Sequence, residues 1–214
     1  MNASWQSAPL GELVSVVRNP VDPTTADPSL TFVGLEHIES ETGAVVGVPL
    51  GTTGIRSSKF SFIAGDILFG KLRPYLRKAG VSTCEGICST DIVPLRPVDK
   101  SLAHLIALQL RSVAFVEQAS LLTSGGSLPR VRTHDLLGIR VRVPVGQEMN
   151  RLAIVAGLLD DARYELNLLD RRLRDLHDIA AAAAIGNSAV SRPRRPMRGP
   201  QQIERTQRQR DLFR

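Results

Sequence analysis

The sequence predicts an α+β protein with three parts: a mixed, β-rich domain over residues 1–144, a long coiled-coil helix over residues 145–186, and a disordered tail over residues 187–214. Three patterns predict this organisation. Short runs of β-branched and aromatic residues, bounded by Gly, Pro or Ser, fill the first part. An apolar heptad repeat runs through the second. The third is rich in Arg, Pro and Gln and poor in apolar residues, which is typical of disorder.

The first part contains four segments with the composition of β-strands. They are "TFVGLEHI" (31–38), "FSFIAGDILFG" (60–70), "DIVPLRP" (91–97) and "GIRVRVP" (138–144). In the last segment Val141 and Val143 alternate with Arg140 and Arg142, which predicts a strand with one buried and one solvated face.

A helix is expected between the last two strand segments. The stretch "SLAHLIALQLRSVAFVEQA" (101–119) has an apolar stripe at helical spacing, formed by Leu102, Leu105, Ile106, Val113 and Val116. Ser101 precedes the stripe and is a candidate N-cap, because its side chain can accept from a free backbone N–H of the first turn. We predict one continuous helix here.

The second part has the signature of a coiled-coil seam. Its apolar positions follow alternating steps of three and four: Leu152, Val155, Leu159, Ala162, Leu166, Leu169, Leu173, Leu176, Ala180 and Ala183. At ~1.5 Å per residue the helix would be roughly 55 Å long, and the first part offers no helix of that length to cover it. We therefore predict that the larger seam residues form a dimer interface: Leu152, Val155, Leu159, Leu166, Leu169, Leu173 and Leu176.

Positive charge is concentrated in separate segments. The net charge is +6, and the tail alone carries eight Arg against Glu204 and Asp211, so the other 186 residues sum to zero. Within that neutral body, residues 56–78 hold six cations against Asp66, and residues 130–142 hold four against Asp135. Such local basic segments are typical of a nucleic-acid footprint, although two solvated rims would give the same pattern. The tail would either add phosphate contacts or only confer solubility.

Several function classes are not supported by any motif. The chain has no run of eighteen apolar residues and no signal-peptide pattern, so we expect a cytoplasmic protein without a membrane segment. Cys84 and Cys88 have no second pair to form a zinc site and are expected to be small core residues. No phosphate-binding loop, glycine-rich cofactor loop or nuclease motif occurs. We expect no catalytic residue, no metal ligand and no cofactor.

Four motifs, in order, resemble those of a known family. They are "FVGLEHIES" (32–40), "SSKFSFIAGDILFGKLRPYLRKAG" (57–80), "EGICSTDIVPLRP" (85–97) and "GGSLPRVRTHDLLGIRVRVP" (125–144). Together they resemble the target-recognition domain of type I restriction–modification specificity subunits, and the resemblance covers residues 8–185. A full-length member has two recognition domains separated by long antiparallel helices. This chain has one of each and so is similar to a half-subunit.

The resemblance implies a non-catalytic subunit that reads double-stranded DNA and holds an adenine methyltransferase and, in some complexes, a restriction subunit. The predicted DNA-binding residues are Arg56, Ser57, Lys59, Lys71, Arg73, Arg77, Lys78, Ser127, Arg130 and Arg132. Because "GKLRPYL" is a family motif, whereas members read different sequences, we assign Lys71 and Arg73 to the DNA backbone or to packing. Base contacts are expected from residues 51–58 or 121–132, and Tyr75 is expected to be packed.

Two other functions remain open at this point. The chain could be a stand-alone DNA-binding regulator or adaptor that reuses the recognition domain without a methyltransferase. It could also be an assembly protein in which only the coiled coil matters and the basic segments are incidental. For the leading interpretation we expect a homodimer through the long helix, although a different half-subunit or helices of the methyltransferase would also cover the seam.

Overall fold

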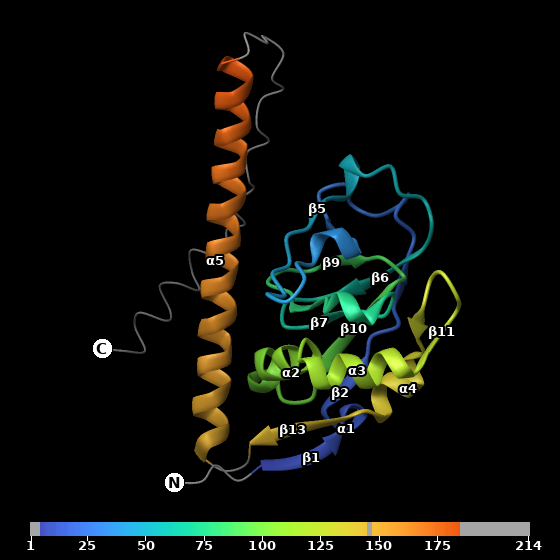
Figure 1. The fold of residues 1–214 in the computed structure, drawn as a ribbon. Helices are drawn as coiled ribbons and strands as arrows, with labels where there is room; N and C mark the ends of the chain where they lie inside the picture. Colours follow the sequence, from blue (N-terminus) through green and yellow to red (C-terminus); the bar gives the residue numbers. More distant parts are fainter. Residues whose placement is uncertain (1–4, 145–146, 185–214) are drawn as a thin grey trace. The chain divides into compact units, whose positions relative to one another are not determined.

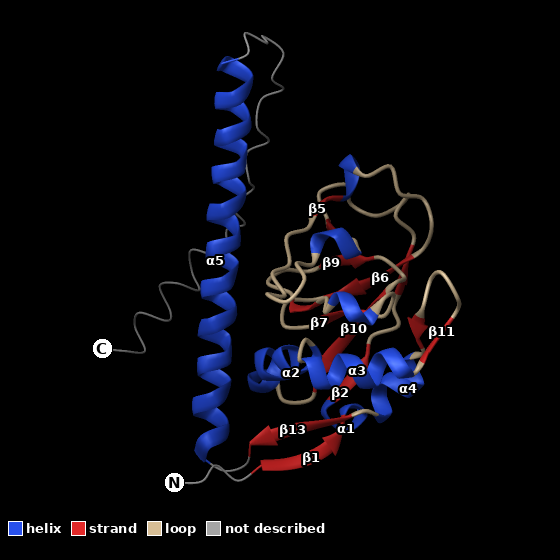
Figure 2. Cartoon of the chain, in the orientation of Figure 1, coloured by secondary structure: helices blue, strands red, loops and turns tan. Residues whose placement is uncertain are grey.

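The predicted α+β class is confirmed by the computed structural model, which describes residues 5–144 and 147–184 (Figures 1 and 2). The strands are β1 (Trp5–Pro9), β2 (Val14–Val16), β3 (Pro20–Val21), β4 (Thr31–Val33), β5 (Val48–Pro49), β6 (Lys59–Phe62), β7 (Ile67–Gly70), β8 (Ala79–Val81), β9 (Gly86–Cys88), β10 (Ile92–Pro97), β11 (Thr123–Ser124), β12 (Arg130–Val131) and β13 (Arg140–Pro144). The α-helices are α1 (Leu10–Leu13), α2 (Ala103–Leu110), α3 (Val113–Leu121), α4 (Thr133–Gly138) and α5 (Gln147–Ala184). The 3-10 turns are η1 (Leu35–His37), η2 (Leu50–Thr52), η3 (Pro74–Leu76) and η4 (Lys100–Leu102).

Two sheets form the body of the domain. A four-stranded antiparallel sheet has the order β2-β10-β7-β8, and a five-stranded sheet has the order β3-β6-β9-β4-β5, in which only β4 and β9 run parallel. All residues of β7 are buried. The unbroken apolar run Ile67–Phe69 follows from this, because a strand covered on both faces has no solvated side to place polar residues on.

The first and last strands of the domain pair with each other. β1 and β13 are antiparallel over five residue pairs, from Trp5 opposite Pro144 to Pro9 opposite Arg140. Val141 and Val143 are buried, and Arg140 and Arg142, which alternate with them, are exposed, as the pattern predicts. The guanidinium of Arg142 lies 5.4 Å from the ring centroid of Trp5. The pairing ends at Pro144, and α5 begins three residues later, at Gln147.

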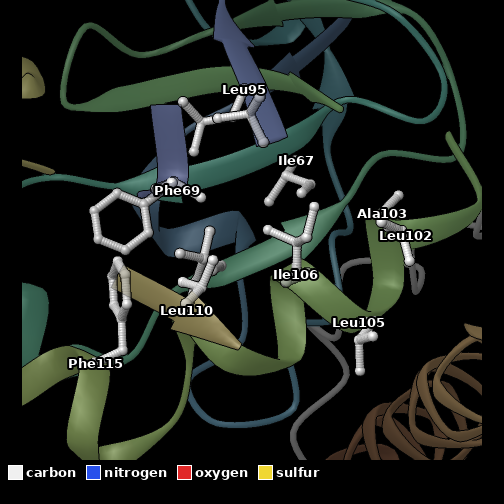
Figure 3. Packing of buried hydrophobic residues seen from close by; sticks show 14 of the residues in the cluster. Ile67, Phe69, Leu95, Leu102, Ala103, Leu105, Ile106, Leu110 and Phe115 are labelled. Atoms are coloured by element: carbon white, nitrogen blue, oxygen red, sulfur yellow. The ribbon is translucent and has the colours of Figure 1, made fainter. Parts of the chain in front are cut away.

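The largest hydrophobic cluster lies between the four-stranded sheet and helices α2 and α3 (Figure 3). Ile67, Phe69 and Leu95 project from the sheet toward Ile106, Leu110 and Phe115 of the helices. The rings of Phe69 and Phe115 meet edge to face at 6.1 Å, an arrangement that places the positive edge of one ring on the negative face of the other. Ala153 and Ala156 of α5 belong to the same cluster.

The prediction of one helix over residues 101–119 is wrong. The structure has η4, α2 and α3, with a break at Arg111 and Ser112. Ser112 is extended and accepts from the backbone N–H of Phe115, so it caps a new helix. The cap at the start is also different, because the Asp99 carboxylate, not Ser101, accepts from the backbone and caps η4. Val113, predicted to lie in the apolar stripe, is exposed.

The long helix predicted over residues 145–186 is confirmed by α5, which the structure describes from Gln147 to Ala184. Its first part packs against the domain, and the compact unit that contains both ends at residue 165. The predicted domain boundary at residue 144 falls at the end of β13, and the predicted tail, residues 187–214, lies outside the described residues. Among the residues that are described, no helix is both long and apolar enough to cross a membrane.

A buried carboxylate connects the turn before β7 with β10. Asp66 accepts two hydrogen bonds of 2.8 Å from the guanidinium of Arg96 and one of 2.9 Å from the backbone N–H of Ile63. The side chain of Asp66 is 1% exposed, whereas that of Arg96 is 39% exposed. The three hydrogen bonds therefore replace those that the carboxylate would make with water, and two of them come from a charged group.

Replacing Asp66 by Asn is expected to lower the free energy of unfolding by about 2–3 kcal/mol, because the buried group keeps its volume but loses its charge-assisted bonds. Urea denaturation measures this loss. Glu85→Gln is the matched control, since Glu85 is exposed and its replacement should change stability by less than about 0.5 kcal/mol. Equal stability of both variants would contradict the role assigned to Asp66.

Candidate nucleic-acid interface

Two of the predicted basic segments lie next to each other. Leu72 and Arg130 form an isolated antiparallel bridge. On either side of it the N–H of Arg73 donates to the carbonyl of Pro129 at 2.8 Å, and the N–H of Val131 donates to the carbonyl of Lys71 at 3.1 Å. Cations that are far apart in the sequence are thus held on adjacent, hydrogen-bonded backbones.

Asp91 organises this pair of segments, and sequence reasoning missed it. Its backbone carbonyl accepts from the N–H of Lys71 at 2.9 Å, and its carboxylate accepts from Nε of Arg130 at 2.8 Å. The hydrogen bond to this carboxylate raises the pKa of Arg130. The acid partly neutralises Arg130 and fixes its direction. A signal was present in the sequence, since Asp91 directly precedes the mostly apolar strand β10.

A strained turn follows the first segment. Arg73 and Arg77 flank η3, and both have left-handed backbone conformations, with φ of 51° and 55°. Such conformations are uncommon for residues with a Cβ. The turn leaves Tyr75 54% exposed, so the prediction that its ring is packed is wrong. Arg73 is exposed too, and its guanidinium makes a long hydrogen bond of 3.5 Å to the carbonyl of Ser127.

Three of the predicted DNA-binding cations bond within the domain. The ammonium of Lys59, a buried residue, donates to the hydroxyl and carbonyl of Ser57. Lys78 donates to the carbonyl of Leu35 at 2.7 Å. Arg77 donates to the carbonyl of Arg111 at 2.7 Å and to Glu41 at 2.9 Å. These hydrogen bonds give the three side chains a structural role inside the protein.

The other predicted residues lie on exposed loops. Arg56 and Ser57 are exposed between η2 and β6, Ser127 is exposed between β11 and β12, and Arg132 is exposed just before α4. Among the described residues neither Arg56 nor Arg132 has an ion-pair partner. Both loops run along the same edge of the domain in the view of Figure 1, in cyan and yellow.

A half-open cavity of about 300 Å³ lies beside Lys71. Its lining is mostly apolar, with Arg18 and Lys71 as its two cations: Val16, Val17, Arg18, Phe60, Lys71, Ile92, Val93, Pro94 and Thr133. Arg18 was missed because it lies in an acidic stretch of sequence, and only the pairing of β2 with β10 brings it here. A mostly apolar lining with two cations suits a group that combines an anion with an apolar face.

The predicted dimer residues are largely open to solvent. Val155, Leu159, Leu166, Leu169, Leu173 and Leu176 are all exposed, with Leu166 and Leu173 at 65%, and Leu152 is half-buried. A different row of the helix, with Ala153 and Ala156, is buried against the domain. Within the described residues, no three His, Cys, Asp or Glu side chains form a group that could hold a metal ion.

Comparisons with known proteins agree on one family. The chain is 30% identical over 153 residues to the specificity subunit of the type I restriction enzyme EcoDI from Escherichia coli, which is 71% of this chain and 33% of that subunit. No family model matches. The fold resembles the HsdS subunit from Thermoanaerobacter tengcongensis, with a TM-score of 0.56, 22% identity and coverage of 88% of this chain and 51% of that one.

A second solved structure, from a study of complex assembly and conformational transition in a type I restriction–modification system, matches with a TM-score of 0.54 and 23% identity, over 86% of this chain and 47% of the other. The chain thus spans between a third and about half of the length of the relatives it matches. The resemblance found in its motifs is confirmed: in sequence and in fold, this chain is a relative of the type I restriction–modification specificity subunits.

Proposed function

We propose that this chain is the DNA-reading subunit of a type I restriction–modification complex. The observation that carries the proposal is the pairing of segments 71–73 and 129–131, which gathers Lys71, Arg73 and Arg130 beside the exposed loop that contains Ser127, in a relative of specificity subunits. Lys71 and Arg73, which have no ion-pair partner among the described residues, are suited to phosphates, since phosphate contacts position a protein on the duplex.

Within this proposal the cations divide into those whose side chains bond inside the domain and those whose charge stays available. Lys71, Arg73 and Arg18 contact phosphates, because they line or flank the cavity and have no ion-pair partner among the described residues. The exposed loops read base edges in the major groove, through residues such as Arg56, Ser57, Ser127 and Arg132, and an Arg there suits a bidentate contact to guanine. Lys59, Arg77 and Lys78 hold the backbone of these segments in place.

Catalysis in such a complex comes from a partner. The chain has no motif that would bind S-adenosylmethionine, so an adenine methyltransferase subunit would supply the chemistry, with a restriction subunit in complexes that also cleave. We expect the purified chain alone to leave DNA unmethylated and to co-purify with the methyltransferase when both are expressed.

The seam of α5 would pair with a second copy of the chain. Six large apolar side chains of the seam are exposed. Burying each of them would stabilise the protein by roughly 1.5 kcal/mol or more, so a partner that covers the seam gains a large favourable free energy. A second copy suits this seam, because two identical helices in an antiparallel pair would cover each other's exposed leucines. An antiparallel pair of helices would carry one recognition domain at each end, related by a two-fold axis.

A two-fold dimer predicts the form of the DNA target. Identical domains related by a two-fold axis read identical half-sites in inverted order, as other symmetric dimers do. The target would be a palindrome interrupted by an unread spacer whose length the paired helices fix.

Mapping of methylated adenines in cells with and without this gene tests the proposal directly. We expect one interrupted, palindromic motif to lose its methylation when the gene is removed. An unchanged methylation pattern, or methylation of DNA by the purified chain alone, would show that the protein has a different function. An asymmetric motif would retain the function but exclude the homodimer.

The double change Lys71→Ala, Arg73→Ala is expected to weaken DNA binding and to reduce the slope of log K against log salt by about two units, because each phosphate that is no longer neutralised reduces the slope by roughly one. Fluorescence anisotropy at several salt concentrations measures both. The control, Lys100→Ala with Arg172→Ala, removes two exposed cations outside the paired segments and should leave the slope within about 0.5 units of the wild-type value. An unchanged slope in the first variant, with folding intact, rejects the phosphate role.

The double change Leu166→Glu, Leu169→Glu is expected to abolish pairing, since it places charges in the centre of the apolar seam. Light scattering of the purified protein should report a dimer for the wild-type chain and a monomer for the variant. The matched control, Arg171→Glu with Asp178→Glu, puts two glutamates on the opposite side of the helix and should remain dimeric. A wild-type chain that stays monomeric at high concentration would exclude the homodimer.

A further inference from the structure

We infer that Asp160 is a positioning residue: its carboxylate fixes the rotation of α5 against the recognition domain, and so fixes the direction in which the domain meets DNA. The inference rests on the proposed function and adds to it a residue that sets the spacing of the two half-sites. It concerns the first part of α5 and the domain, which form one compact unit.

Both carboxylate oxygens of Asp160 have polar partners: His104 in α2 and Arg111, the residue that follows α2. Oδ1 accepts from Nη2 of Arg111 at 2.6 Å, and Oδ2 lies 3.0 Å from Nδ1 of His104. Arg111 is 1% exposed and also donates from Nη1 to the carbonyl of Ala79 in β8, at 2.8 Å. Arg163, one turn further along α5, adds a second cation 3.9 Å from Oδ1. A single carboxylate thus joins the helix to α2 and, through Arg111, to the four-stranded sheet.

Such an ion pair does more for geometry than for stability. Burial lowers the pKa of the Arg111 guanidinium, while the Asp160 carboxylate opposes that shift. The free-energy cost of removing two charges from water offsets most of the attraction between them. Apolar residues of similar size in the same place often stabilise a protein equally well. The apolar contacts of Met149, Ala153 and Ala156 hold the rotation of the helix less firmly, because the hydrophobic effect is not directional. Two directed hydrogen bonds on one carboxylate remove that freedom.

The rotation of the helix decides where the seam points. At about 100° per residue, the row that meets the domain (Ala153, Ala156 and Asp160) lies about a third of a turn away from the row with Val155 and Leu159. One face of α5 holds the domain while another stays open to solvent. If a second copy covers the open face, the angle between the domain and the dimer axis is set by the contacts of Asp160.

The same contacts reach the segment proposed to bind phosphates. Nε of Arg77 donates to the carbonyl of Arg111, the residue whose guanidinium holds Asp160. Arg77 is separated from Arg73 only by the three residues of η3, a turn with left-handed residues at both ends. A short, hydrogen-bonded path therefore connects α5 with Lys71 and Arg73. A change in the position of the helix would act on these cations through Arg111, Arg77 and the short turn η3.

The test compares three full-length variants. Arg111→Met with Asp160→Leu replaces the ion pair by apolar groups, so that the melting temperature should stay within about 5 °C of the wild-type value. Asp160→Glu keeps the charge and lengthens the side chain by one methylene group. The matched control, Asp161→Leu with Arg172→Met, removes one acid and one base from α5 without touching the contacts of Asp160.

The first measurement needs no DNA. Spin labels on cysteines introduced at Leu121 and Glu165 report the distance between the domain and α5, with labelled protein diluted in an excess of unlabelled protein. Cys84 is replaced by Ser, and Cys88 stays unlabelled because it is buried and burial raises the pKa of its thiol to about 12. We expect a narrow distance distribution for the wild type and the control, and a broad one for the variant Arg111→Met, Asp160→Leu (the apolar pair). For Asp160→Glu we expect a narrow distribution with a displaced centre.

The second measurement uses DNA. Duplexes selected from a random pool by the wild-type chain are resynthesised with spacers one base pair shorter and longer, a change that rotates a half-site by about 35°. The wild type should prefer its own spacer by about tenfold, and the apolar pair by about twofold or less. Asp160→Glu should keep a sharp preference, for the same or an adjacent spacer.

The outcomes separate the two proposals. If the wild-type chain selects no sequence, the proposed function fails, whereas the label distances still decide whether Asp160 fixes the helix. A narrow, undisplaced distribution for both the apolar pair and Asp160→Glu would overturn the positioning role. If the apolar pair fails to fold, Asp160→Glu decides alone: a displaced narrow distribution supports the inference, and an undisplaced one overturns it.

Discussion

The buried guanidinium of Arg111 is the contact on which the arrangement of this molecule depends. It lies where α2 ends, donates to the backbone of β8 and holds the carboxylate of Asp160 on α5. Its own carbonyl accepts from Arg77 at the end of η3. Sheet, helices and the strained turn therefore share one residue. Among the described residues Nε of Arg111 has no partner, so even this group is not fully satisfied, which fits a contact that specifies geometry more than it adds stability.

Burial, together with charge, decides which cations of the domain remain available to a partner. The segment from Arg56 to Lys78 looks uniformly basic in sequence, yet Lys59 and Lys78 donate to carbonyl oxygens of the domain, whereas Arg56 and Arg73 are exposed. A cation that is desolvated must find acceptors inside the protein, since an unpaired buried charge is very costly. Those that remain in solvent keep their charge available to a partner.

The long helix has two distinct faces, one packed against the domain and one exposed. Small residues, Ala153 and Ala156, allow the backbone of α5 to approach the domain, while leucines on a separate row remain exposed. The heptad repeat marks the exposed row clearly because seven residues bring a side chain back to nearly the same side of a helix. The domain-facing row is marked only by alanines, which are common in any helix and carry no signal of their own.

The sequence by itself determined the α+β class, the alternating strand β13, the length of α5 and its seam, because each depends on the spacing of neighbouring residues. The order of the motifs also sufficed to identify the family. Only the tertiary structure decided that Ser112 breaks the predicted helix, that Asp91 joins Lys71 to Arg130, that Arg18 lies beside the cavity, and that Asp160 meets Arg111. These contacts join residues distant in the chain, or depend on which side chains become buried. The free energy of a buried charge is set by partners that no local pattern contains.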